Sequence, residues 1–133
     1  MPGSRTASCA CGALRITLAG EPSRVYACSC LECQRATGSA FSYRAVFAKE
    51  AVAVVEGERS TWRRGSEAGR WVEQTFCPAC GTLVFMEGEG LPGSVSVSVG
   101  CFADPGFAPP STLHRASRRH GWYALLPGIG STG

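Results

Sequence analysis

The sequence predicts a small, mainly β domain with short helical turns. Among its 133 residues are 17 glycines and 8 prolines, a composition that favours many turns and few long helices. No segment repeats apolar residues with the period of an amphipathic helix, whereas several segments alternate apolar and polar residues as strands do. The length and a hydrophobic fraction of 44% fit one globular domain over residues 1–133.

The expected strands are short, and most are separated by breaks that contain Gly, Pro or Asp. Leu14, Ile16 and Leu18 alternate with polar residues, and residues 94–100 read Ser-Val-Ser-Val-Ser-Val-Gly, which places three valines on one face of a strand. Helical turns are expected only around residues 32–36. We therefore predict twisted antiparallel sheets. The expected strands are residues 14–18, 24–28, 43–48, 52–56, 59–63, 71–76, 82–86 and 94–100.

Charge and hydropathy argue against several classes of protein. The net charge of +3 is mild, so we interpret the arginines within residues 63–64 and 115–119 as solvated surface and expect no nucleic-acid partner. Residues 1–13 lack the apolar core of a signal peptide. The longest aliphatic stretch, residues 51–55, is too short to cross a bilayer. We therefore expect a cytoplasmic protein with no membrane partner and with reduced thiols.

The eight cysteines form three groups and one single residue. They are Cys9-x-Cys11, Cys28-x-Cys30-x-x-Cys33, Cys77-x-x-Cys80 and Cys101. A disulfide framework is typical of secreted chains, and a thioredoxin-like pair needs a strand-helix-strand context that this sequence lacks. Closely spaced cysteines in a reducing compartment instead favour metal binding.

The first and third cysteine groups share a glycine directly after their second cysteine. Gly12 and Gly81 can take the left-handed conformation that a tight turn requires, and such a turn aims backbone N–H groups at sulfur. Two pairs supply the four ligands of a tetrahedral structural zinc ion, whose binding free energy adds to that of folding. The expected ligands of this ion are Cys9, Cys11, Cys77 and Cys80.

The middle group, Cys28, Cys30 and Cys33, has three cysteines and no following glycine. Three protein ligands with an open fourth position are typical of a catalytic zinc ion. The alternative is that Cys101 completes a closed site, although a single buried cysteine usually acts as a small hydrophobic residue. Three thiolates make the ion electron-rich, and a thiol bound to zinc loses its proton. We therefore expect the second site to activate a thiol.

Taken in order, these motifs resemble the glutathione-dependent formaldehyde-activating family, which includes centromere protein V. The resembling segments are residues 9–13, 28–39, 76–82, 99–100 and 104–105, with a weaker echo in His114 and Trp122. They define a motif core over residues 8–105 and a C-terminal tail over residues 106–133. Ser29 stands where members of that family often carry histidine.

The resemblance implies a mostly β fold with two zinc ions, one structural and one of catalytic type, on the two cysteine sets named above. It also implies carbon–sulfur lyase activity, in which glutathione and formaldehyde condense reversibly to S-(hydroxymethyl)glutathione. The partners would then be glutathione, or a similar small thiol, and an aldehyde. Cys28, Cys30 and Cys33 would act in catalysis as metal ligands and not as nucleophiles.

Two other interpretations stay open. A non-enzymatic zinc module could bind a protein or a nucleic acid, and a lyase could act on a different thiol conjugate. For an enzyme, the hydroxyls of Ser29, Thr37 and Ser39 are candidates to stabilise the oxyanion. Arg35 and Arg44 either hold a substrate carboxylate or are ordinary surface arginines.

Overall fold

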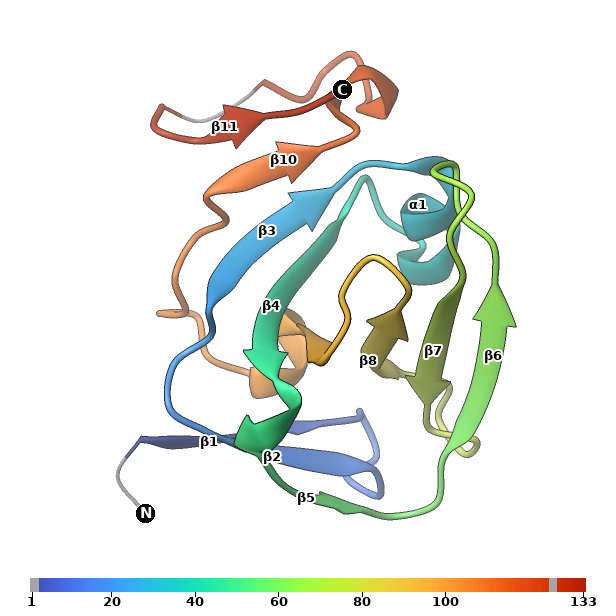
Figure 1. Cartoon of the computed structure of the whole chain (residues 1–133), viewed down its shortest axis with the longest axis vertical. Coiled ribbons are helices and arrows are strands. Elements are labelled where there is room, and N and C mark those ends of the chain that lie inside the picture. The colour runs from blue at the N-terminus through green and yellow to red at the C-terminus, as the bar shows by residue number, and fades with distance from the viewer. Residues whose placement is uncertain (1–2, 125–126) are drawn as a thin grey trace.

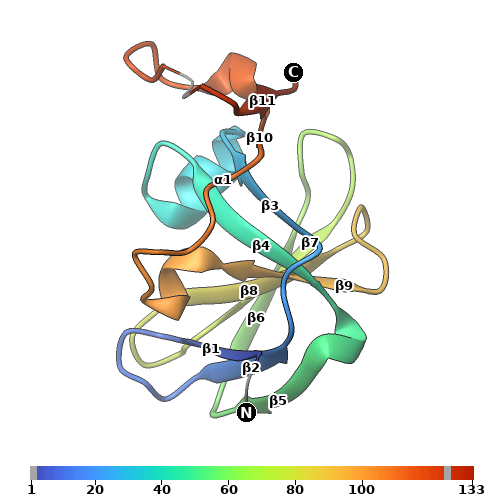
Figure 2. The same cartoon turned by 90° about the vertical axis from the view of Figure 1, so that its left-hand side faces the viewer.

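The computed structural model describes residues 3–124 and 127–133, and the strands in these ranges form two sheets (Figure 1). The smaller sheet has the order β1-β2-β5, with β1 (Ser4–Ser8), β2 (Arg15–Ala19) and β5 (Val52–Glu56). Both of its pairings are antiparallel. It lies at the end of the molecule opposite the chain's C-terminus (Figure 2).

The larger sheet has the order β11-β10-β3-β4-β9-β8-β7-β6. The pairings from β3 to β6 are antiparallel, whereas β10 runs parallel to β3 and β11 runs parallel to β10. Its strands are β3 (Arg24–Cys28), β4 (Ser42–Ala48), β6 (Ser60–Arg64), β7 (Val72–Phe76), β8 (Leu83–Gly88), β9 (Ser94–Ser98), β10 (Thr112–His114) and β11 (Gly130–Ser131).

Helical structure in the described residues is limited to short pieces. Helix α1 (Leu31–Thr37) directly follows β3 and includes the predicted helical residues 32–36. Gly38 ends this helix with a left-handed backbone, φ 62°, and its N–H donates to the Gln34 carbonyl. The 3₁₀ turns are η1 (Lys49–Ala51), η2 (Val99–Phe102) and η3 (Ala116–Arg118). The predicted mainly β class with short helical turns is therefore confirmed.

The predicted strands all appear in the structure, with ends that differ by at most two residues. Three strands were not predicted. Strand β1 has a single buried residue, Ala7, so it carries no alternation that a sequence pattern could reveal. Strands β10 and β11 have three and two residues, which is shorter than any window in which a period can be recognised.

The core lies between the small sheet and one face of the large sheet. Val95 and Val97 share a buried cluster with three apolar residues in and just before β2, and all five side chains are buried. The three residues are Leu14, Ile16 and Leu18. The valines of β9 therefore share one face, as the alternation predicts. The serines of β9 face the other way, but Ser96 is also buried, because the second face of the large sheet is covered as well.

The C-terminal tail adds β10 and a second, smaller core. Leu113 and Ala116 pack with Ala27 of β3, and Tyr123 covers this cluster. Trp122 of the tail is 75% exposed and stacks on the His120 ring. No helix among the described residues is long and apolar enough to cross a membrane.

Gly57 lets the chain after β5 pass against the turn that follows the first cysteine pair. Its φ is +99°, and a Cβ at this position would lie 1.8 Å from the Ala13 carbonyl oxygen. We expect Gly57→Ala to destabilise the fold by roughly 3 kcal/mol or more, because it adds a backbone clash to the cost of a positive φ. Thermal or urea unfolding measures the loss.

Gly20→Ala is the matched control, since Gly20 also has a positive φ, +74°, but open space around its Cβ position. It should cost about 1–2 kcal/mol. Equal losses in the two variants would contradict the close approach of Gly57 to Ala13.

Candidate metal centres and an adjoining cavity

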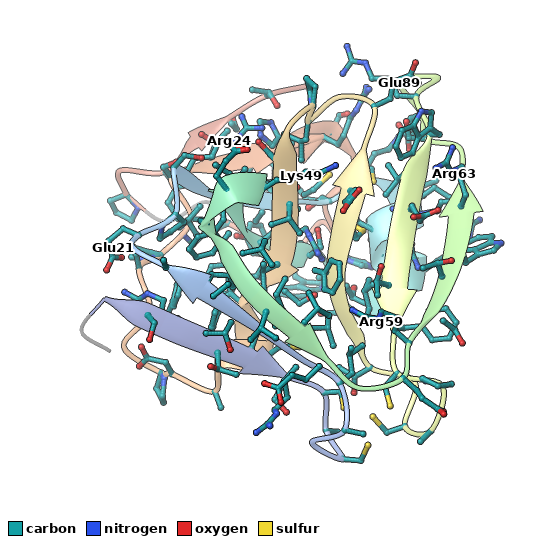
Figure 3. All side chains as sticks on the ribbon, turned by 60° about the horizontal axis from the view of Figure 1, so that its bottom comes forward. Glu21, Arg24, Lys49, Arg59, Arg63 and Glu89 are labelled. Atoms are coloured by element: carbon teal, nitrogen blue, oxygen red, sulfur yellow. The ribbon has the colours of Figure 1, made fainter. Side chains whose placement is uncertain are left out.

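Four cysteine sulfurs meet where the turn after β1 approaches the turn after β7. The sulfurs of Cys9, Cys11, Cys77 and Cys80 all lie within 4.8 Å of one another, and Figure 3 shows sulfur atoms gathered where these turns meet. Cys11 Sγ is 3.6 Å from Cys9 Sγ and 3.7 Å from Cys77 Sγ. Zinc–sulfur bonds of about 2.3 Å in a tetrahedron separate the sulfurs by about 3.8 Å. The four sulfurs therefore fit a tetrahedral zinc ion.

Two tight turns of similar form hold this cluster. Gly12 and Gly81 have φ of 83° and 80°, so the left-handed conformation predicted for both is confirmed. The Gly12 N–H donates to the Cys9 carbonyl at 3.1 Å, and the Gly81 N–H donates to the Cys77 carbonyl at 2.8 Å. The Leu14 N–H donates to Cys9 Sγ at 3.2 Å. Such N–H groups compensate the negative charge of thiolate ligands.

The four thiols of this cluster differ in acidity. The hydroxyl and the N–H of Thr82 lower the pKa of Cys80 to about 5. The N–H of Ala13 lowers the pKa of Cys11, but the neighbouring thiols of Cys9 and Cys77 outweigh it and raise that pKa to about 11. Sulfurs packed this closely oppose each other's ionisation. A divalent cation removes that opposition, since a coordinating thiol is deprotonated.

The second cluster lies where β3 leads into α1. Cys28 ends β3, Cys30 is the N-cap of α1, and Cys33 lies in its first turn. Their three sulfurs lie within 4.8 Å of one another. The Cys33 N–H donates to Cys30 Sγ at 3.3 Å, so the helix start itself positions two of the sulfurs. The short connection between β3 and α1 brings the third sulfur, that of Cys28, close to the other two.

Cys101 does not join this cluster. It lies in η2, where it packs against the main core and its thiol faces the Leu83 carbonyl at 3.7 Å. In residues 3–124 and 127–133, no fourth Cys, His, Asp or Glu side chain completes the group of three. All eight cysteines are free thiols. The placement of Cys101 thus argues against a closed four-cysteine second site.

The thiols of the second cluster share their protons unequally. Hydrogen bonds from Cys28 and Cys30 lower the pKa of Cys33, and the charge of Arg44 lowers it further. The same contacts with Cys30 and Cys33, together with burial, raise the pKa of Cys28. One thiol therefore ionises easily at the expense of the others. Full ionisation of all three needs a cation among them.

Two buried hydroxyls next to this cluster fit a metal–thiolate centre. Ser29 is 1% exposed and Ser42 is 2% exposed, and neither hydroxyl has a hydrogen-bond partner in the structure. Ser29 lies between Cys28 and Cys30 in sequence, and Ser42 lies opposite Cys28 in the pairing of β3 with β4. Buried hydroxyls are nearly always hydrogen-bonded. Thiolates would supply the acceptors that these two hydroxyls lack.

A cavity of about 530 Å³ adjoins the second cluster. It extends over the polar face of the large sheet between β3, the β6–β7 and β8–β9 connections and the C-terminal tail, and Cys28 is the cysteine that lines it. Its wall includes Arg24, Tyr26, Cys28, Ser66, Arg70, Trp71, Met86, Glu87, Ser96, His114, Arg115 and Thr132.

Three arginines give this cavity a positive charge. Within the described residues, Arg24, Arg70 and Arg115 form no ion pair. Glu87 is the carboxylate in the wall, and it pairs with Lys49 at 3.4 Å. An anionic ligand would therefore meet unpaired guanidinium groups, which bind carboxylates through paired hydrogen bonds.

His114 also lines the cavity, and its place beside the cluster could not be read from the sequence. The parallel pairing of β10 with β3 sets His114 opposite Cys28. Its Nδ1 lies 2.9 Å from the Thr132 hydroxyl. Burial and then the charge of Arg24 lower its pKa, so the imidazole is neutral near pH 7. In the sequence, the one indication that His114 matters was its weak match to the family motifs.

Comparisons with known proteins place the chain in a family. The sequence profile of the glutathione-dependent formaldehyde-activating enzyme family matches residues 4–118. The chain belongs to this family. A crystal structure of a Rhodobacter sphaeroides protein resembles it with a TM-score of 0.59 and 22% sequence identity, over 78% of this chain and 91% of that one. This likeness shows a shared fold. No curated protein matches the chain.

Other residues singled out in this formaldehyde-activating family member lie away from the cavity. The Thr37 hydroxyl donates to the Cys33 carbonyl at 2.8 Å, and exposed Ser39 lines a separate depression beside Trp122. Ser29 is buried and is not part of the cavity wall. Arg35 pairs with Glu32 at the surface. These placements do not support the oxyanion and carboxylate roles considered for them.

Two arginines that we expected at the surface of this family member are buried. Arg44 is 1% exposed and Arg64 is 7% exposed. Arg44 is bound by serines of β9, and Arg64 donates from Nε to Gln74 at 2.6 Å. The expectation of solvated side chains was wrong for both, because the polar face of the large sheet is covered.

Removing a sulfur of the first cluster should unfold the domain. A structural zinc site of this kind contributes on the order of 10 kcal/mol, more than the net stability of a small domain. We expect Cys80→Ala to lose one bound ion and the β signal in circular dichroism. Cys101→Ala is the control and should keep both. A Cys80→Ala protein with unchanged metal content and melting would contradict the assignment.

Removing a sulfur of the second cluster should have a different result. We expect Cys30→Ala to fall from two bound ions to one, as counted by elemental analysis, and to keep its β signal, because the first cluster remains intact. Loss of fold in Cys30→Ala as complete as in Cys80→Ala would contradict the division into a structural and a second site.

Proposed function

We propose that this protein is a zinc-dependent carbon–sulfur lyase-type enzyme. It activates a small thiol of the glutathione type for reversible addition to formaldehyde or another small aldehyde. The observation that carries the proposal is the position of Cys28. It belongs to a cluster of three sulfurs with no fourth ligand in the described residues, and it lines a cavity with three unpaired arginines.

The three sulfurs are the chain's own contribution to the reacting centre. Cys28, Cys30 and Cys33 would hold the ion. A zinc ion with one open position favours the thiolate form of a thiol substrate. Cys28 is half-buried, while Cys30 and Cys33 are buried, so the cluster is accessible from the side of the cavity.

The cavity fits a thiol that carries carboxylates. Its volume of about 530 Å³ lies within the range of small-molecule sites. Glutathione has two carboxylates, and Arg24, Arg70 and Arg115 offer guanidinium groups to hold them. Binding at these arginines would fix the orientation of the thiol with respect to Cys28, which lowers the entropic part of the barrier.

His114 would move the proton. Its neutral imidazole beside Cys28 can accept the thiol proton and return it to the product oxygen. In the forward direction an S–C bond forms and the carbonyl π bond breaks, which leaves a C–O single bond. The thiol proton ends on that oxygen. The lyase direction reverses these steps.

A non-enzymatic zinc module is the competing function. Such a module would be closed by a fourth protein sulfur, but Cys101 lies outside the second cluster. A lyase that acts on another anionic thiol conjugate would use the same arginines, and a panel of thiols distinguishes it.

The test is adduct formation by the zinc-loaded protein, followed by NMR with formaldehyde and a panel of thiols. We expect a rate above background with glutathione and little with the neutral thiol 2-mercaptoethanol. Arg70→Ala should raise KM for glutathione about tenfold or more, because a charge-assisted hydrogen bond is lost.

Arg59→Ala is the matched control, since Arg59 is exposed and lies outside the cavity wall. No rate above background with any thiol of the panel, or equal effects of the two arginine substitutions, would contradict the proposed function.

A further inference from the structure

Arg44 is a buried positive charge with neutral partners. It lies in the middle of β4 and is 1% exposed. Its Nε donates to the Ser96 hydroxyl at 2.7 Å, and its Nη2 donates to the Ser96 carbonyl at 2.6 Å. Its Nη1 donates to the Ser98 hydroxyl at 3.2 Å. Three hydrogen bonds hold the guanidinium in place, but none of them comes from an anion.

No carboxylate balances this charge. In the described part of the chain, Arg44 forms no ion pair and no Asp or Glu is buried. Arg64, another buried arginine on the same sheet face, is also a cation and repels it. A buried charge without a counter-charge is costly in a protein interior. The structure therefore calls for an anion near Arg44 that the acidic residues do not provide.

The second sulfur cluster lies next to this position on the same sheet face. In the β3–β4 pairing, Cys28 lies opposite Ser42 and Tyr26 lies opposite Arg44. Residues two apart on a strand share a face, so Arg44 is the next residue along from the Cys28–Ser42 pair on the polar face.

We propose that Arg44 is the built-in counter-charge of the Cys28, Cys30 and Cys33 centre. Three thiolates and one divalent cation carry a net charge of −1, and the Arg44 guanidinium brings the buried unit to zero. This role rests on the second metal centre assigned under the proposed function. Arg44 contacts neither substrate nor ion; it is a positioning residue that acts through the sulfurs.

The serines of β9 explain why an arginine suits this role. Ser96 and Ser98 fix the planar guanidinium through three hydrogen bonds, and Arg44 does not line the cavity, so its charge does not compete with Arg24, Arg70 or Arg115 for substrate. Because the interior has a low effective dielectric, the charge acts strongly on the sulfurs and is little screened by salt.

The experiment compares zinc affinity at the second site, in the full chain, for the natural protein and two variants. Arg44→Gln keeps a hydrogen-bonding group but removes the charge, and Arg44→Lys keeps the charge. Competition with a chromophoric chelator measures affinity, and cobalt substitution reports sulfur coordination through its charge-transfer bands. We expect Arg44→Gln to bind the second ion roughly tenfold or more weakly, equally at low and high salt, and Arg44→Lys to retain most of the affinity.

Arg64→Gln is the matched control, because Arg64 is buried on the same sheet face but binds Gln74. It should leave the affinity for the second ion unchanged even if it lowers the melting temperature. The first cluster is an internal control and should keep its ion in every variant.

Unchanged second-site affinity in folded Arg44→Gln would overturn the inference, as would equal losses in Arg44→Lys and Arg44→Gln. Should Arg44→Gln fail to fold, Arg44→Lys decides: retained affinity supports a role for the charge, and its loss contradicts that role. If the unsubstituted protein binds a single ion, the proposed second metal centre is wrong. This result differs from an unchanged second-site affinity in Arg44→Gln, which would contradict only the role of Arg44.

Discussion

Like charges at short range are the constraint on which this structure depends. The chain packs seven sulfurs into groups of four and three, each within 4.8 Å, and thiolates this close need a divalent cation between them. The first group joins the turn after β1, in the small sheet, to the turn after β7, in the large one. A metal ion there ties the two sheets together in addition to the core between them, which matters most in a domain of this size.

The large sheet separates two kinds of chemistry by the alternation of its strands. Strand β9 shows this most clearly, because its valines supply the apolar core while Ser96 and Ser98 hold Arg44 on the opposite face. That opposite face carries Cys28 at the end of β3 and forms the floor of the cavity. The same strands that stabilise the fold thus position the sulfur cluster, the cavity and the buried charge relative to one another.

Much of the fold could be predicted because its signals are local. Strand alternation, the turns at Gly12 and Gly81 and the grouping of cysteines all lie within a few residues of sequence. The remainder depends on pairings between distant segments. His114 comes to Cys28 only through the parallel strand β10, which is too short to show a period. The burial of Arg44 likewise follows from the cover over a sheet face, and no neighbouring residue in the sequence indicates it.

The most direct test of this account is the metal content of the purified protein, together with the X-ray absorption spectrum of each bound ion. The account predicts two zinc ions per chain. One has four sulfur ligands at about 2.3 Å; the other has three sulfurs and one exchangeable ligand that an added thiol replaces. A metal-free protein whose cysteines are joined as disulfides would contradict it, and so would a second ion closed by four protein sulfurs.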